Sequence, residues 1–179
     1  MSGDESRGRG LRIRDLALYG LLIAVMEIAK HSLDFLPNVE LITLLTILYS
    51  LYLGRRTVLL TTAFTLIEIF FWGVHTWVVM YLYVWPLLCF LTLRMRGLHR
   101  ERLANVWFAV LAGFFGLFFG ALCSLVYLVI GGPQTALSWW IAGIPYDLVH
   151  AGSNFVICLI LFKPLDALLE RALARWRAG

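Results

Sequence analysis

Residues 139–163 read WWIAGIPYDLVHAGSNFVICLILFK, a run long enough to cross a bilayer that nevertheless contains Asp147, His150 and Asn154. Their spacing of three and then four residues puts these polar side chains on one face of a helix. An acid at the centre of a membrane helix costs roughly 2.5 kcal/mol or more, so this face should meet protein or water rather than lipid. We interpret it as one wall of a ligand site. The alternative is a structural hydrogen-bond cluster in a helix bent by Pro145.

The whole chain has the composition of an integral membrane protein. Hydrophobic residues make up 61% of its 179 residues and charged residues 15%, and the mean hydropathy is +0.83. These values exclude an ordinary soluble domain and a disordered chain. The apolar runs predict an all-α fold, a compact bundle of six transmembrane helices in a single domain covering residues 1–179. The expected spans are residues 14–35, 38–53, 57–73, 76–93, 104–130 and 139–162.

The basic residues are distributed unevenly around these spans. All but one of the 15 Lys and Arg residues lie before the first span or in alternate connections. The positive-inside rule therefore places both termini in the cytoplasm and the loops near residues 36, 74 and 134 outside. Residues 1–13 are then a cytoplasmic tail, and residues 164–179 are expected to form a short amphipathic helix on the inner surface. The first apolar run lacks a small-residue cleavage site, so we expect it to be retained.

Three further spans carry polar or aromatic stripes in the halves that this topology places outside. We expect them to meet the sixth span around one outward-facing chamber. The candidate substrate-binding residues are Glu27, Lys30, His31, Asn38, Glu40, Glu68, Trp72, His75, Tyr81, Trp85, Tyr146, Asp147, His150 and Asn154. The charged residues of the first span could instead neutralise one another as helical ion pairs. Trp77, Trp139 and Trp140 suit a belt at the membrane boundary.

Small residues mark places where helices can approach closely. In the fifth span they recur at every fourth position, at Ala112, Gly116, Gly120 and Ser124. Such a stripe predicts tight packing against a neighbouring helix. Gly20 and Ala24 form a similar pair in the first span and predict a docking surface. Gly131, Gly132 and Pro133 are a turn signal in the last outer loop.

Several functional signatures are absent from the sequence. It contains no G-x-x-x-x-G-K-[ST] loop, so the chain is not expected to hydrolyse ATP by that route. H-E-x-x-H and G-x-S-x-G are missing too, and we expect neither an enzyme nor a bound cofactor. Cys89, Cys123 and Cys158 lie in separate apolar runs without Cys-x-x-Cys spacing, which is typical of small buried hydrophobic residues. Nothing in the sequence indicates nucleic-acid binding.

Three segments together resemble a known family. They are LPNVELITLLTILYSLYLG at 36–54, YVWPLL at 83–88 and WWIAGIPYDLVHAGSNFVICLILFKPL at 139–165. With six spans in 179 residues, the chain resembles over most of its length the substrate-binding S components of energy-coupling factor (ECF) vitamin transporters. The resemblance implies a high-affinity vitamin-binding subunit in a prokaryotic plasma membrane, with an outward-facing pocket.

The resemblance also implies protein partners. S components work with a transmembrane T subunit that carries two cytoplasmic ABC ATPases. In the family an Ala-x-x-x-Ala pair on the first helix packs against the T subunit, and Gly20 and Ala24 stand at the matching place here. ATP binding and hydrolysis in the partners would topple the S component and present its site to the cytoplasm.

The identity of the ligand stays open at this stage. Aromatic residues suggest a ring-bearing vitamin, and the acids favour a cationic, thiamine-like compound. Lys30 would suit a carboxylate, so cobalamin-, pyridoxine- and pantothenate-type ligands remain alternatives. A nickel or cobalt uptake subunit is a second hypothesis, because Glu27 with His31 and Asp147 with His150 offer metal ligands at helical spacing. Metal-specific relatives carry an N-terminal histidine motif that this chain lacks. A membrane scaffold without transport activity is a third.

Overall fold

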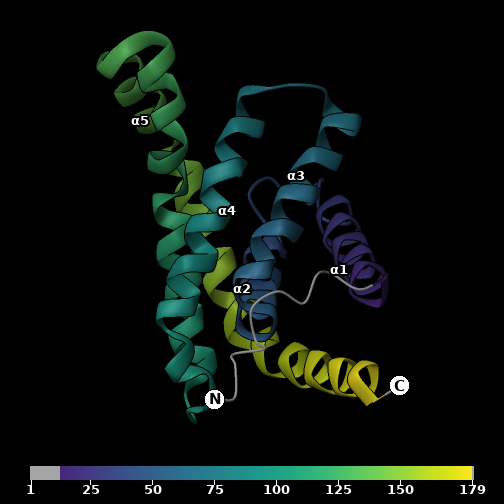
Figure 1. The fold of residues 1–179 in the computed structure, drawn as a ribbon. Helices are drawn as coiled ribbons and strands as arrows, with labels where there is room; N and C mark the ends of the chain where they lie inside the picture. The colour runs from purple at the N-terminus through teal and green to yellow at the C-terminus, as the bar shows by residue number, and fades with distance from the viewer. Residues whose placement is uncertain (1–12, 179) are drawn as a thin grey trace, which may run out of the picture.

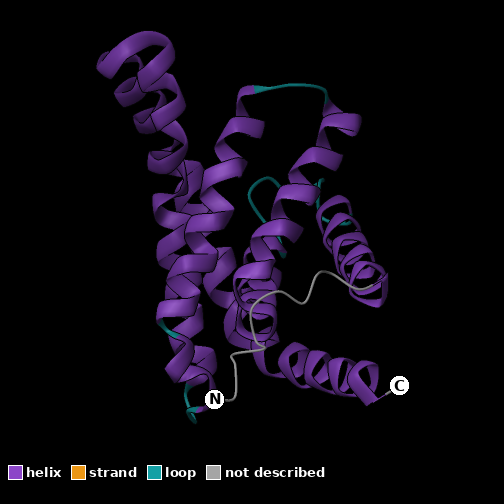
Figure 2. Ribbon diagram, viewed as in Figure 1, coloured by secondary structure: helices purple, strands orange, loops and turns teal. Residues whose placement is uncertain are grey.

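The computed structural model describes residues 13–178, so most of the expected N-terminal tail lies outside the described residues. Within that range the chain is helical and has no strand (Figure 2). The main helices are α1 (Ile13–His31), α2 (Ile42–Leu53), α3 (Thr57–Trp72), α4 (Thr76–Arg94) and α5 (Ala104–Ala178). Two short 3-10 helices connect them, η1 (Gly54–Arg56) and η2 (Arg96–Arg100). The all-α prediction is therefore confirmed for the described residues.

Two helices, α4 and α5, are long and apolar enough to cross a membrane. α5 reverses direction at Gly132, whose φ of 78° and ψ of −178° are not helical. Figure 1 shows its first arm (residues 104–131) rising beside α4 and its second arm (residues 133–163) returning beside the first. The other main helices are too short or too highly charged to meet the same requirement for a membrane span. α2 and α3 have 12 and 16 residues and are therefore only about 18 and 24 Å long, whereas α1 carries several charges.

α2 is the central helix of the bundle. Residues 42–51 are all buried, and α2 contacts α1, α3, α4 and α5. Its sequence, ITLLTILYSLYL, has no charged residue and is apolar on every side, as expected for a helix surrounded by others. The surrounding helices therefore form a shell, and the segment that leads into α2 is held at the centre of one end of the bundle.

The connection before α2 is longer than the sequence predicted. The first two spans were expected at 14–35 and 38–53, but α1 ends at His31 and α2 begins at Ile42. Pro37 disfavours a helical conformation in the residue before it, and Asn38 has a left-handed φ of 58°. Residues 32–41 therefore form an irregular segment, which we call the α1–α2 loop.

The connection between the arms of α5 is shorter than predicted. A loop was expected between residues 130 and 139, but the chain turns at Gly132 and is helical again immediately afterwards. Proline fits the first turn of a helix, because its missing N–H has no partner to lose there, so Pro133 starts the second arm. The turn predicted at residues 131–133 is confirmed. The loop predicted between residues 130 and 139 is wrong, because the chain is helical again after Gly132.

The small-residue stripe packs as expected. Ala112, Gly116, Gly120 and Ser124 are all buried. A Cβ atom added at Gly116 would lie 2.8 Å from the backbone oxygen of His150, and one at Gly120 would collide with the Asp147 carboxylate. Glycine at 116 lets the backbones of the two arms approach closely, and glycine at 120 leaves room for the Asp147 side chain.

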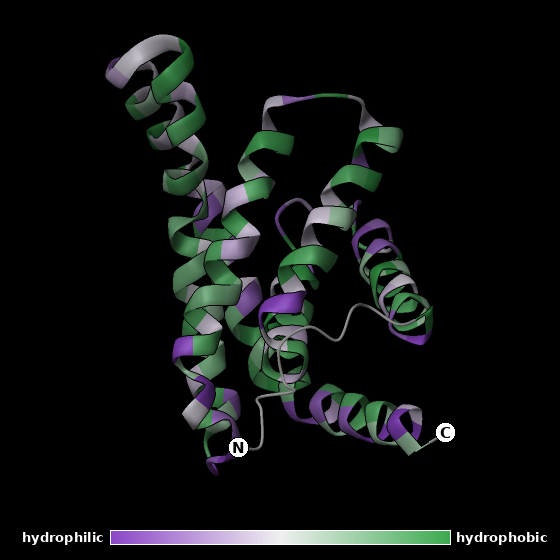
Figure 3. Ribbon diagram, in the orientation of Figure 1, coloured by the Kyte–Doolittle hydropathy of each residue, from purple (hydrophilic) through white to green (hydrophobic). Residues whose placement is uncertain are grey.

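Hydrophilic residues gather at the lower end of the bundle in Figure 3, where the last part of α5 lies across the other helices. This part, after Pro164, is the predicted amphipathic helix. Its Asp166 accepts a hydrogen bond from the Tyr52 hydroxyl at 2.8 Å and contacts His99 at the same distance. Arg100 donates to Glu170 at 2.9 Å, and this hydrogen bond raises the pKa of the exposed Arg100 guanidinium.

The approach of the two α5 arms gives a stability prediction. Gly116→Ala should destabilise the protein by about 1–3 kcal/mol, because the added methyl group meets backbone atoms that cannot rotate away. Gly152→Ala is the matched control on the second arm, since a Cβ atom there meets nothing within 4 Å and alanine favours the helix. Thermal unfolding of the two detergent-purified variants measures their stabilities. Equal unfolding midpoints for Gly116→Ala and Gly152→Ala would contradict the close approach of the two α5 arms.

Candidate functional site

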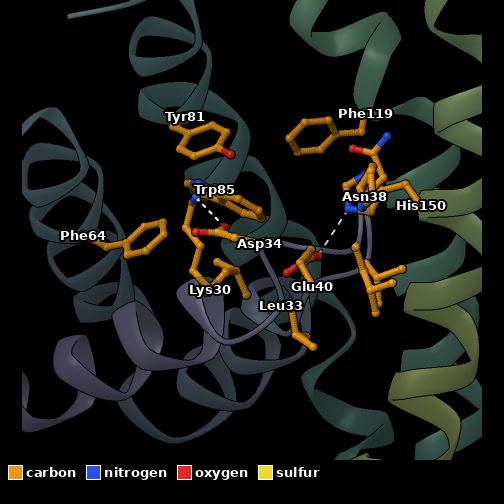
Figure 4. Close-up of a pocket in the computed structure, with 14 residues that line it drawn as sticks. Lys30, Leu33, Asp34, Asn38, Glu40, Phe64, Tyr81, Trp85, Phe119 and His150 are labelled. Carbon is orange, nitrogen blue, oxygen red and sulfur yellow. Dashed lines mark hydrogen bonds and ion pairs between the residues drawn. The ribbon is translucent and has the colours of Figure 1, made fainter. Parts of the chain in front are cut away.

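A cavity of about 180 Å³ lies where the α1–α2 loop meets α3, α4 and α5 (Figure 4). We call it the loop cavity. The sequence predicted six of its lining residues, namely Lys30, Asn38, Glu40, Tyr81, Trp85 and His150. They come from four separate segments of the chain, so the fold brings together residues that are up to 120 positions apart.

A second cavity, also of about 180 Å³, adjoins the first. We call it the tryptophan cavity because Trp72 and Trp77 line it, together with Glu68. Lys30 and Tyr81 line both cavities and therefore stand between them. We call the two adjoining spaces the chamber, and it is bordered by α1, the α1–α2 loop, α3, α4 and α5.

Five ionisable residues lie along one side of this chamber. We call them the charged cluster, which consists of Glu27, Lys30, His31, Asp34 and Glu68. The Lys30 ammonium lies 3.0 Å from Glu68 Oε2 and 3.5 Å from Asp34 Oδ1. His31 Nδ1 lies 2.8 Å from Asp34 Oδ2, and its Nε2 lies 3.4 Å from Glu68 Oε1. The expected ion pairs of the first span are present, although Asp34 lies in the α1–α2 loop. The contacts with Glu68 extend the cluster to α3.

Lys30 also interacts with an aromatic residue. Its ammonium group lies 5.5 Å from the centroid of the Trp72 ring, within the range of a cation–π interaction. The Lys30 side chain is thus held by an acid and by an indole ring on α3. This arrangement keeps a positive charge at the boundary of the two cavities.

Glu40 and His150 form a second polar pair on the other side of the loop cavity. Glu40 Oε1 lies 3.2 Å from His150 Nε2, and Glu40 Oε2 accepts the backbone N–H of Thr43 at 2.8 Å. Glu40 thus satisfies a free donor at the start of α2 and also faces the cavity. The ring of Phe119 lies 4.8 Å from the His150 ring and packs against its edge.

Aromatic rings form the wall between the two polar regions. The Tyr81 ring lies 5.3 Å from Trp85 and 6.5 Å from Phe119, and Trp85 lies 5.9 Å from Phe119. The indole Nε1 of Trp85 is buried and has no hydrogen-bond partner among the described residues. A buried indole N–H without a partner is unusual. Trp85 also lines the loop cavity.

Six predicted site residues line neither cavity. Two of them, Glu27 and His31, belong to the charged cluster beside the chamber. Asp147 accepts the backbone N–H of Gly120 at 2.9 Å, and Asn154 donates to Thr43 Oγ1 at 3.1 Å. Both side chains are buried, and each bonds a residue outside its own arm of α5. His75 and Tyr146 are exposed. His150 therefore belongs to the chamber, whereas its two polar neighbours on the same arm do not line it.

The sequence analysis missed several apolar residues of the loop cavity. Phe64 and Phe119 line it, as do Leu33, Leu36 and Val39 of the α1–α2 loop. Phe64 lies four residues before Glu68 and thus on the same face of α3, which was a usable signal. Phe119 lies in a Phe-rich run, and no pattern in the sequence separates it from the other phenylalanines there.

The hydrogen bond of Asn154 gives a second prediction. Asn154→Ala should lower the free energy of unfolding by about 1–3 kcal/mol, because it removes a buried link between α5 and α2. Tyr146→Ala, at an exposed position on the same arm, should change it by no more than about 0.5 kcal/mol. Thermal unfolding in detergent compares the two. An Asn154→Ala variant as stable as Tyr146→Ala would show that the bond is not structural.

No family model matches the chain, and the searches of curated proteins and of solved structures also found no match. The functional argument therefore depends on the arrangement of residues around the chamber.

Proposed function

We propose that this protein is the substrate-binding S component of an ECF-type importer, which captures a vitamin or a related heterocyclic micronutrient outside the cell. In this proposal the chain crosses the plasma membrane of a prokaryote six times, with both arms of α5 as spans and both termini in the cytoplasm. The 73–75 connection and the Gly132 turn lie at one end of the bundle (Figure 1). η2 and the last part of α5 lie at the opposite end, which supports this topology.

The observation that carries the proposal is the composition of the loop cavity. A water-accessible space with charged groups on two sides and an aromatic wall between them is typical of a site for a small ring-bearing ligand. In Figure 4, Lys30 and His150 approach from opposite sides, with Trp85 between them. The aromatic wall would hold the ring, and the polar groups would orient its substituents.

The charges suggest the class of vitamin. The carboxylates around the chamber, Asp34, Glu40 and Glu68, outnumber the one ammonium group of Lys30, which is paired with Asp34 and Glu68. A cationic or amine-bearing heterocycle would meet these carboxylates favourably, and the aromatic rings would add cation–π attraction. We therefore favour a thiamine-like ligand.

The exposed face of α1 fits the proposed partners. Gly20 and Ala24 are both exposed, and a Cβ atom at Gly20 would meet nothing within 4 Å. Leu21 and Ile28 on the same helix are also exposed, at 59% and 66%. Small residues beside exposed apolar ones suit close contact with a partner helix. In this proposal that partner is the T subunit, and its two ABC ATPases supply the energy for transport.

The proposal is tested by identifying the ligand that the protein carries. The full chain is purified in detergent from cells grown in rich medium and then denatured, and the released compounds are identified by mass spectrometry. A stoichiometric vitamin is the expected result. Release of no vitamin, together with no binding of vitamins in calorimetry, would refute the proposal and favour a scaffold.

A substitution in the cavity then tests the place of binding. Trp85→Phe keeps an aromatic ring but removes the unpaired indole N–H, so it should weaken binding of the released vitamin about 5- to 15-fold. Tyr146→Phe is the control, because it removes a polar hydrogen from an exposed aromatic residue outside the chamber. Calorimetry measures both affinities. Equal affinities for the two variants would place the ligand elsewhere.

A further inference from the structure

The charged cluster contains a set of atoms that the vitamin proposal does not use. Glu27 and His31 on α1 and Glu68 on α3 each place one ligand-type atom within 4.8 Å of the other two. Sequence spacing had paired Glu27 with His31 as possible ligands. The third member comes from a different helix, and only the fold brings it there.

The distances among these atoms match those around a metal ion. His31 Nε2 lies 3.4 Å from Glu68 Oε1 and 3.8 Å from Glu27 Oε2. In tetrahedral zinc sites the metal–ligand bonds are about 2.0–2.2 Å, which places neighbouring ligand atoms roughly 3.3–3.6 Å apart. The two His31 pairs are therefore close to this spacing, and all three ligand atoms lie within 4.8 Å of one another.

The same atoms are buried without hydrogen bonds. Glu68 has a fully buried side chain, and among the described residues neither of its oxygens has a hydrogen-bond partner. The same is true of both Glu27 oxygens and of His31 Nε2. Lys30 lies 3.0 Å from Glu68 Oε2, which leaves Oε1 facing His31. Lys30 and His31 are the basic neighbours of these acids, and hydrogen-bonding positions on the two carboxylates remain open to a further ligand.

Asp34 orients His31 for this role. The Asp34 carboxylate accepts hydrogen bonds, so the 2.8 Å contact places the imidazole proton on Nδ1. Nε2 then presents its lone pair toward Glu27 and Glu68. Metal-binding histidines commonly have their second nitrogen bonded to a carboxylate in this way.

Acidic side chains outnumber basic ones in the cluster. Glu27, Asp34 and Glu68 are its acids, and Lys30 and His31 are its basic members. A cation placed among the three acids would be attracted to them.

We propose that Glu27, His31 and Glu68 bind a divalent transition-metal ion. One imidazole nitrogen and two carboxylate oxygens suit zinc, cobalt or nickel better than magnesium or calcium, which prefer oxygen ligands alone. Three protein ligands leave a fourth position for water or for a ligand in the chamber. The site lies beside the tryptophan cavity, which Glu68 also lines. This inference goes beyond the vitamin proposal and does not rest on it.

Metal titration tests the site directly. The full chain, purified in detergent and treated with a chelator, is titrated with Co²⁺ while the visible absorption is recorded, and Zn²⁺ is then added as a competitor. We expect one Co²⁺ per chain, a ligand-field spectrum typical of tetrahedral coordination, and displacement by Zn²⁺. Glu27→Gln and His31→Ala should each weaken binding by at least about 100-fold. Asp34→Asn, which alters only the orienting carboxylate, should weaken it about 10- to 100-fold.

His75→Ala and Glu101→Gln are the controls, because both residues are exposed and line neither cavity. Both should bind Co²⁺ like the unaltered chain. Absence of one-to-one binding to the unaltered chain would overturn the inference, and so would unchanged affinity in the folded Glu27→Gln variant. The titration uses the metal alone, so its failure leaves the vitamin result standing, and failure to find a vitamin leaves the metal result standing.

Discussion

The contact between Lys30 and Glu68 is the interaction on which the arrangement of the chamber depends. It joins α1 to α3 through an ammonium and a fully buried carboxylate 3.0 Å apart. Removing one partner of such a pair leaves an unpaired buried charge, which is strongly unfavourable. The pair therefore keeps α1 against α3 in the half of α1 that borders the chamber. Because Lys30 lines both cavities, the same contact also sets the boundary between them.

Sequence patterns predicted well those features that depend on one helix at a time. The four-residue repeat from Ala112 to Ser124 correctly indicated close helix packing. The stripes on α1 and α3 correctly identified polar faces, because residues three or four apart share a helix face whatever surrounds it. Spacing along a single helix likewise predicted Lys30 on α1 and Tyr81 and Trp85 on α4 as site residues. All three line the loop cavity.

Features that depend on two helices could not be read from the sequence. Asp147 and His150 share a face of α5, yet Asp147 bonds Gly120 on the opposite arm while His150 meets Glu40 before α2. The spacing of residues predicts which face of a helix a side chain lies on. It does not predict which residue of another helix that side chain contacts. The extent of the α1–α2 loop was missed for a related reason. Hydropathy assigned residues 32–35 to the first span and 38–41 to the second, because it does not register the left-handed backbone at Asn38.

The central claim is that the chamber opens to the outside of the cell and holds the ligand. Val39→Cys tests it directly, because Val39 lines the loop cavity and the native Cys89, Cys123 and Cys158 are buried. A membrane-impermeant maleimide applied to intact cells should label Val39→Cys, and the ligand released from the purified protein should protect it. Arg96→Cys in η2, at the opposite end, should be labelled only after permeabilisation. Labelling of Val39→Cys only after permeabilisation, or labelling unaffected by ligand, would contradict the account.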